Sequence, residues 1–157
     1  TKNMKILKFF IAMFVMALSC TSCLESDLEK LDTYDGCDIT AGYAWYRYKG
    51  TDKINASGEV QVIQKQLQRT GQAIDNEAAT CALTFKVPTN FTEKEKADVN
   101  INNIVLAVNI STASVMQRLE GAPKLGVPAD WSTPHKYIVK AADGKSKIWT
   151  ISVNLTK

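Results

Sequence analysis

The chain has 157 residues and a net charge of +3, with 19 basic and 16 acidic side chains. Residues 1–22 hold three of the lysines and no acid, which leaves 16 basic and 16 acidic side chains from Cys23 onward. Nucleic-acid binding requires a clustered basic face, so we expect no nucleic-acid partner. The roughly 135 residues that follow are enough for one domain with its own core.

Residues 1–22 have the layout of a lipoprotein signal peptide. Lysines precede an unbroken run of ten apolar residues from Phe9 to Leu18, and small residues with two cysteines follow. A transmembrane helix needs about 20 apolar residues, so this run is too short to span a bilayer. We expect the segment to direct export and to be removed before a lipid-modified cysteine. An ordinary signal peptide cut elsewhere and an uncleaved anchor are the alternatives.

Two cysteines end this segment. Cys23 follows the small residues Thr21 and Ser22. Cys20 follows Leu18-Ser19, and the enzyme that cleaves lipoprotein signals prefers small residues before the cysteine. We therefore predict lipidation, with palmitate as a typical acyl chain, at Cys23, with Cys20 as the alternative. The lipid would attach the protein to a membrane.

Residues 23–36 are rich in acids and short of aromatic residues, which is typical of a solvated tether. Asp32, Asp35 and Asp38 recur at every third position. A calcium loop instead needs oxygen ligands at alternate positions, a glycine turn and a closing bidentate acid. We expect an acidic tether and no metal site here.

From residue 37 to the end, apolar and polar residues alternate between turn residues, which is the pattern of β-strands. Gly50 to Gly58 is expected to form a turn, and Gly121 to Pro134 a long surface loop. The last hairpin should turn at Asp143-Gly144 and direct Trp149, Ile151 and Val153 inward. The other strands are expected at about residues 38–49, 59–69, 78–87, 101–111 and 114–119.

A single short helix is expected between these strands. Thr92 and Glu95 have the spacing of a capping box, which predicts a helix over Glu93 to Asp98. About seven short strands with little helix indicate an all-β fold, an antiparallel immunoglobulin-like β-sandwich over residues 37–157. An eight-stranded barrel is the main competitor.

The sequence contains no catalytic constellation that we recognise. His135 is the only histidine, and no Gly-x-Ser-x-Gly elbow accompanies it. A zinc site would lack the usual cysteine spacing beyond the leader, and no glycine-rich phosphate loop is present. We expect a protein that is not an enzyme and that uses no cofactor and no metal.

Cys37 and Cys81 allow two interpretations. An exported protein meets an oxidising compartment, and a disulfide between them would close a loop of about 45 residues and contribute roughly 3 to 4 kcal/mol. Alternatively, Cys81 lies on the apolar face of its strand and packs there as a small hydrophobic residue.

Aromatic residues suggest a ligand platform, because sugars expose apolar faces that stack on flat rings. Strand alternation places Tyr43 and Trp45 on one face and Tyr46 and Tyr48 on the other, so one pair is expected to pack in the core. Trp131 is the best single candidate for ligand binding, because it lies in a loop between two prolines.

Four parts of the sequence are distinctive: Ser22–Leu28, Asp38–Thr40 with Trp45-Tyr46, Asn90–Glu93 with Asn109–Thr112, and Gly121–Gly126 before Tyr137–Gly144. Together they resemble one family of small Bacteroidota lipoproteins of unknown function. The resemblance implies an outer-membrane protein that is lipid-anchored at the cell surface, with the periplasmic leaflet as the alternative. It also implies that Glu25 and Asp27 act as an export signal.

Two classes of function follow. The first is a non-catalytic binding or accessory module on the surface or in the periplasm, linked to glycan binding or nutrient uptake. The alternative is a structural or adhesive component of the cell envelope that binds a protein partner.

Overall fold

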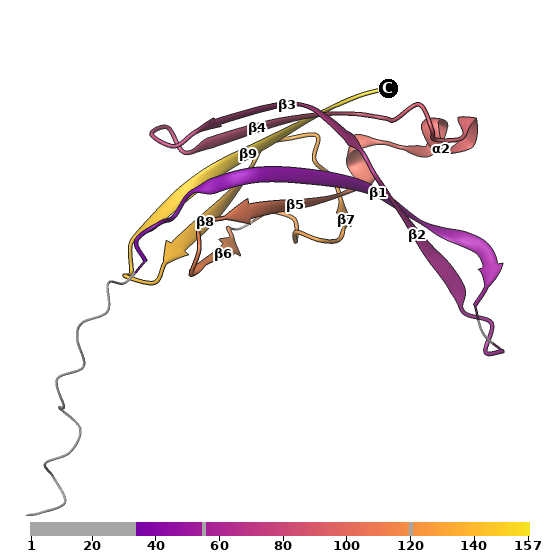
Figure 1. Ribbon diagram of the computed structural model, residues 1–157, viewed down its shortest axis with the longest axis horizontal. Coiled ribbons are helices and arrows are strands. Elements are labelled where there is room, and N and C mark those ends of the chain that lie inside the picture. The colour runs from indigo at the N-terminus through magenta and orange to yellow at the C-terminus, as the bar shows by residue number, and fades with distance from the viewer. Residues whose placement is uncertain (1–33, 55, 120) are drawn as a thin grey trace, which may run out of the picture. The chain divides into compact units, whose positions relative to one another are not determined.

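The computed structural model describes residues 34–157 except residues 55 and 120 (Figure 1). The predicted signal peptide and most of the predicted tether lie outside the described residues. The described chain forms two β-sheets, of four and five strands, in the orders β2-β1-β5-β7 and β3-β4-β9-β8-β6. The strands are β1 (Ile39–Lys53), β2 (Val60–Gln66), β3 (Gln68–Asp75), β4 (Thr80–Lys86), β5 (Ile104–Ile110), β6 (Ser114–Arg118), β7 (Pro128–Ala129), β8 (His135–Ala141) and β9 (Ser146–Thr156).

The core lies between the two sheets, as alternation in the sequence predicts. One sheet contributes Ile39, Tyr46 and Leu106, and the other contributes Phe85 and Trp149, all of them buried. Trp149 and Ile151 are buried and Val153 packs against the core, so the predicted inward face of the last strand is confirmed. Burial of these rows supplies the main stabilisation of an all-β sandwich, the fold class that we expected.

The chain passes from one sheet to the other at Leu67, within the segment that we expected to be one strand. β2 pairs with β1, whereas β3 pairs with β4 in the other sheet. Leu67 is buried between the two strands, and its N–H donates to the carbonyl of Ala44 at 2.9 Å. β3 and the short β7 raise the number of described strands to nine, against the roughly seven that turn signals predict.

The final strand, β9, lies between β4 and β8. Its pairing with β8 is antiparallel, whereas its pairing with β4 is parallel. The other strand pairs in the described residues are antiparallel. Parallel pairing needs a long crossover connection, and the whole chain between β4 and β9 provides it. Alternation in a sequence does not reveal which strand becomes a neighbour, so the parallel pair was not predicted.

Two expected loops are partly strand. β1 continues through Gly50 to Lys53, with an irregular register after Lys49, so the turn is shorter than the predicted Gly50–Gly58. The N–H of Ile54 donates to the carbonyl of Glu59 at 2.9 Å across this turn. In the predicted surface loop of residues 121–134, β7 pairs with β5 and Ala122 is buried.

The predicted helix is present as α2 (Glu93–Asp98) with its complete capping box. The N–H of Glu95 donates to the Thr92 hydroxyl at 3.3 Å, and the Thr92 N–H donates to the Glu95 carboxylate at 2.8 Å. A one-turn 3-10 helix, η1 (Ile101–Asn103), then leads into β5. Reciprocal capping satisfies donors at the start of a helix that is too short to be stable alone.

We expect Trp149→Ala to lower the free energy of unfolding by about 3 to 5 kcal/mol, because truncation of a buried tryptophan removes a large packed surface and leaves a cavity. It also removes the hydrogen bond from the indole Nε1 to the Cys37 carbonyl, which is 2.9 Å long. Urea denaturation followed by circular dichroism measures the loss. The neighbouring Ile148 is 53% exposed, so Ile148→Ala is the control and should change stability by less than about 0.5 kcal/mol. Equal losses would show that the strand register is wrong.

Candidate functional site

The outer face of the four-stranded sheet carries two neighbouring aromatic rings. Tyr43 and Trp45 point away from the core, because Gly42, Ala44 and Tyr46 alternate with them and are buried. Both rings are half-buried, with centroids 6.2 Å apart and planes 32° apart. We call this pair the aromatic platform.

The neighbouring strand β5 leaves the aromatic platform open. In the register, Tyr43 lies opposite Ala107 and Trp45 lies opposite Val105. Ala107 is small, so its side chain covers little of the tyrosine ring. Val105 lies between Trp45 and Pro128 in the register and is only 2% exposed, although it belongs to the outer face. The indole therefore rests against an apolar floor, which limits its freedom to rotate.

Arg69 reaches the aromatic platform from the other sheet. Its guanidinium lies over the Tyr43 ring, 5.1 Å from the centroid, in a cation–π contact. Its Nη1 donates to the Gly42 carbonyl and to Gln72 Oε1, each at 2.9 Å. Gln72 Oε1 also accepts from the Gly42 N–H at 3.1 Å. These side chains take the place of a paired strand along this part of β1 and hold the guanidinium against the ring.

Arg47 lies on the same face, two residues beyond Trp45. Its Nε and Nη2 both donate to Gln64 Oε1, at 2.8 and 2.6 Å, and its Nη1 donates to the Gly126 carbonyl at 3.2 Å. The side chain thus connects β2 with the loop before β7. The outer face of the four-stranded sheet is formed by alternate residues of β1, β2 and β5. None of these outward-facing residues is Asp or Glu within residues 41–49, 62–66 and 104–110.

The opposite face of β1 is held by Glu95 of α2, which is 6% exposed. The Tyr48 hydroxyl donates to Glu95 Oε1 at 2.5 Å, and Lys65 Nζ lies 2.6 Å from the same oxygen. The Tyr46 and Tyr48 rings stack with centroids 5.1 Å apart. The predicted division of the four rings onto opposite faces is thus confirmed, and the structure shows that Tyr46 and Tyr48 are the inward pair.

These contacts shift two pKa values in opposite directions. Hydrogen bonds from Lys65 and then from Tyr48 lower the pKa of Glu95 to about 2. The hydrogen bond to that carboxylate is the main cause that raises the pKa of Tyr48 to about 12. Glu95 is therefore a charged anchor across the neutral pH range, and it fastens α2 to the inner side of the β1–β2 hairpin.

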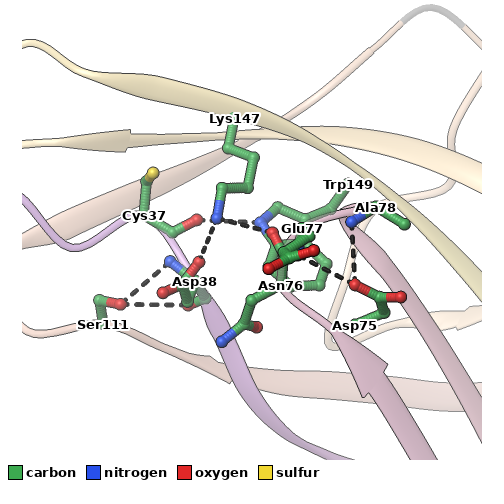
Figure 2. Close-up of polar contacts among 9 residues, drawn as sticks. All are labelled: Cys37, Asp38, Asp75, Asn76, Glu77, Ala78, Ser111, Lys147 and Trp149. Carbon is green, nitrogen blue, oxygen red and sulfur yellow. Dashed lines mark hydrogen bonds and ion pairs between the residues drawn. The ribbon is translucent and has the colours of Figure 1, made fainter.

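A second polar cluster holds the start of the domain (Figure 2). Lys147 forms an ion pair with Asp38 and donates to the Asn76 carbonyl at 3.0 Å. Ser111 Oγ accepts from the Asp38 N–H at 3.0 Å, and Asp35 pairs with Lys145 at 3.0 Å. Asp35 and Asp38, which were considered above as calcium ligands, are thus ion-paired with lysines. This supports a structural role for the cluster.

A surface groove of about 670 Å³ lies elsewhere, beside β6 and β8. It is lined by Arg118, Lys124 and Leu125, among others, and by Tyr137, whose side chain is buried and donates to the Pro123 carbonyl at 2.7 Å. The groove therefore offers a ligand no free aromatic ring from Tyr137, and we favour the aromatic platform as the candidate site.

The expectation that Trp131 lies exposed in a surface loop, where it could bind a ligand, is wrong. Its side chain is 1% exposed and packs on the Tyr137 ring, with centroids 6.4 Å apart. His135 contacts the indole edge-on, with centroids 5.5 Å apart. The pairing of β7 with β5 holds this loop against the domain, and the backbone N–H of Trp131 donates to the Ile101 carbonyl at 3.1 Å. Prolines on both sides therefore do not keep the ring at the surface.

The structure holds Cys37 and Cys81 as free thiols rather than as a disulfide. Cys81 is fully buried in β4, and burial raises its pKa to about 11, which leaves it an unreactive thiol. It packs as a small hydrophobic residue, the second of the two interpretations. The predicted lipidation and export residues, Cys20, Cys23, Glu25 and Asp27, lie outside the described residues.

The described residues contain neither a candidate metal site nor a candidate membrane-spanning helix. Within residues 34–157, apart from 55 and 120, no three His, Cys, Asp or Glu side chains are grouped so that they could hold a metal ion. The same part of the chain contains no helix that is long and apolar enough to cross a bilayer.

Sequence reasoning identified the two rings but missed the residues around them. Arg69 and Gln72 belong to β3, a strand along which apolar and polar residues do not alternate clearly, so the sequence did not predict it. Arg47 was visible as the next outward position after Trp45, so strand alternation could have placed it on this face. Its partner Gln64 follows only from the register between β1 and β2.

Comparison with known proteins identifies two similarities. Residues 39–152 match the family described as DUF5018-related. A crystal structure of a "putative secreted protein" from Bacteroides fragilis is similar to this chain, with 43% sequence identity and a TM-score of 0.72. The match covers 80% of this chain and 100% of that chain. No curated protein matches the chain. The organism agrees with the resemblance to a Bacteroidota family, whereas the lipid anchor stays a prediction.

We expect Glu95→Gln to lower the free energy of unfolding by about 1 to 3 kcal/mol at pH 7, because Lys65 and Tyr48 lose their charged acceptor. Glutamine can still form the capping box, so the loss reports on those two contacts. The folded-state pKa of Glu95 is about 2, below its ordinary value of 4.5. The stabilisation is therefore complete above about pH 4.5, and the difference between wild type and variant should shrink as the pH falls toward 2.

Urea denaturation at several pH values measures this difference, and Glu93→Gln is the control. Glu93 pairs with Lys96 on the same helix, but its side chain is 90% exposed. Its replacement should cost less than about 0.5 kcal/mol. A difference for Glu95→Gln that does not depend on pH would contradict the charged network.

Proposed function

We propose that this chain, which belongs to the DUF5018-related family, is a non-catalytic binding module of the cell envelope that holds a glycan on the aromatic platform. The observation that carries the proposal is the pair of adjacent, outward-facing rings of Tyr43 and Trp45 on the open face of the four-stranded sheet. Nothing in the family match or in the solved relative indicates catalysis.

The geometry of the aromatic platform suits an extended ligand. Sites for small molecules are usually concave and enclose most of the ligand, whereas the two rings lie side by side on the outer face of a sheet, with Arg69 against Tyr43 and Arg47 two residues beyond Trp45. Each sugar ring of a polysaccharide has an apolar face that can stack on an aromatic ring. Because Glu95 holds the inner side of β1, and Arg47 and Arg69 hold the outer side, the two rings are ordered before a ligand arrives.

The location that we propose is outside the cytoplasm. The leader in residues 1–22 supports export, and the solved relative is described as secreted. We further propose a lipid anchor at Cys23 in the outer membrane, with Glu25 and Asp27 as the signal for the cell surface. A glycan-binding module placed there would serve as an accessory to nutrient uptake.

One observation favours the alternative function, a structural or adhesive envelope component that binds a protein partner. The β1–β2 hairpin extends beyond the part of β1 that pairs with β5 (Figure 1). It exposes apolar side chains near its end, where Ile54 is 62% and Val62 is 58% exposed. Such side chains are a common feature of protein-binding surfaces.

A glycan array with plant, host and microbial polysaccharides, followed by isothermal titration calorimetry of the full chain in mild detergent, tests glycan binding. We expect Trp45→Ala and Tyr43→Ala each to weaken binding of the selected glycan by about tenfold or more, since aromatic anchors dominate binding energies. Ile148→Ala on the other sheet is the control and should bind like the wild type. Absence of binding to every glycan at millimolar concentration would favour the protein-binding alternative.

Metabolic labelling with an alkyne fatty acid tests the lipid anchor. We expect label in the wild type and in Cys20→Ala, and none in Cys23→Ala, because the small residues before Cys23 suit the processing enzyme. The reverse pattern would move the lipid to Cys20.

A further inference from the structure

We infer that the aromatic platform selects glycans that carry carboxylates, and that Arg69 binds the carboxylate beside the stacked sugar ring. This inference rests on the proposed function and deepens it, because it names the chemical class of the glycan. It follows from how the arginines of this face are bonded and from the charges around them.

The two arginines differ from the lysines in their partners. Each ion pair among the described residues uses a lysine, such as Lys65 with Glu95 or Lys147 with Asp38. Arg47 and Arg69 instead donate only to neutral oxygens, which belong to glutamine side chains and backbone carbonyls. These bonds orient both guanidinium groups and leave their positive charge unneutralised.

Arg69 also has donors to spare. Its hydrogen bonds within the described residues use Nη1, whereas Nε and Nη2 make none. The side chain is exposed, so these two nitrogens are open to a ligand. The Nε and Nη2 edge of a guanidinium presents two parallel N–H groups, which match the two oxygens of a carboxylate.

The surroundings favour an anion at this position. The part of the chain from Cys23 onward is neutral in total, yet the outer face of β1, β2 and β5 over the ranges given above carries Arg47 and Lys49 and no acid. With Arg69 at its edge, the face is locally positive and attracts anions. The guanidinium lies over the Tyr43 ring, so a carboxylate bound to it would be held next to a sugar that stacks on the platform.

Two other anionic ligands share part of this chemistry. Sulfated glycans carry their charge on a tetrahedral group, two oxygens of which can also accept from a guanidinium, so they are a stringent comparison. Single-stranded nucleic acid also stacks on aromatic rings, but its binding depends on a basic groove that follows the backbone. Three cations on one sheet face provide no such groove, so we favour the acidic glycan and use the other two as comparison ligands.

Isothermal titration calorimetry of the full chain in mild detergent tests the inference. The ligands are polygalacturonate, alginate and hyaluronan, each with its carboxyl-reduced neutral form, together with dextran sulfate and oligothymidylate. We expect at least one uronate polymer to bind about tenfold more tightly than its reduced form, and more tightly than dextran sulfate or oligothymidylate. Added salt should reduce this preference.

Arg69→Gln should remove the preference, so that the uronate polymer and its reduced form bind with equal affinity. The ratio of the two affinities is the readout, because Arg69 also holds the Tyr43 ring and its loss weakens both forms. Arg69→Lys, which keeps the charge without the paired N–H groups, should show an intermediate preference. Arg118→Gln, an exposed arginine on the other sheet, is the matched control and should keep the full preference. Circular dichroism confirms that each variant is folded.

The outcomes separate this inference from the proposed function. If neutral forms bind as tightly as uronates and Trp45→Ala abolishes both, glycan binding stands and the carboxylate preference is overturned. Tighter binding of dextran sulfate or oligothymidylate than of each uronate also overturns it. If no glycan binds in either form, both proposals fail.

Discussion

The crossing of the chain between the two sheets at Leu67 is the constraint on which the candidate site depends. Leu67 is buried at the point where β2 ends in one sheet and β3 begins in the other. As a result, Arg69 and Gln72 lie beside the edge of β1 that faces away from β5, beyond the end of its pairing with β2, and they bond to Gly42. A residue of the five-stranded sheet thereby becomes part of a surface on the four-stranded sheet.

β1 serves stability on one face and ligand binding on the other. Its inward residues contact the core and the charged anchor Glu95, whereas Tyr43 and Trp45 face outward. The separation is electrostatic as well as steric, since the buried carboxylate is neutralised by Lys65 while the arginines of the outer face have neutral partners. Substitutions on the outer face should therefore alter binding with little effect on the fold, which makes the proposals testable.

Trp131 and Trp45 show why exposure is hard to infer from sequence. Trp131 lies among prolines and small polar residues, a composition typical of surface loops, yet the ring is buried because β7 attaches this loop to β5. Trp45 lies in a strand, where the alternation of side chains and the neighbouring strands decide whether its ring is exposed or buried. The alternation of apolar and polar residues along a strand can be recognised from a few neighbouring residues, whereas the packing of a loop depends on contacts with residues far away in the sequence.

The sequence by itself determined the all-β class, the capped helix α2, the inward rows of the last hairpin and the division of the β1 aromatic residues into two pairs on opposite faces. These features follow from alternation, capping and turn chemistry, which act over a few residues. Only the tertiary structure decided the crossing at Leu67, the parallel pairing of β4 with β9 and the approach of Arg69 to Tyr43. The physical reason is that strand neighbours are chosen by the packing of the whole core, and one strand's pattern is compatible with several neighbours.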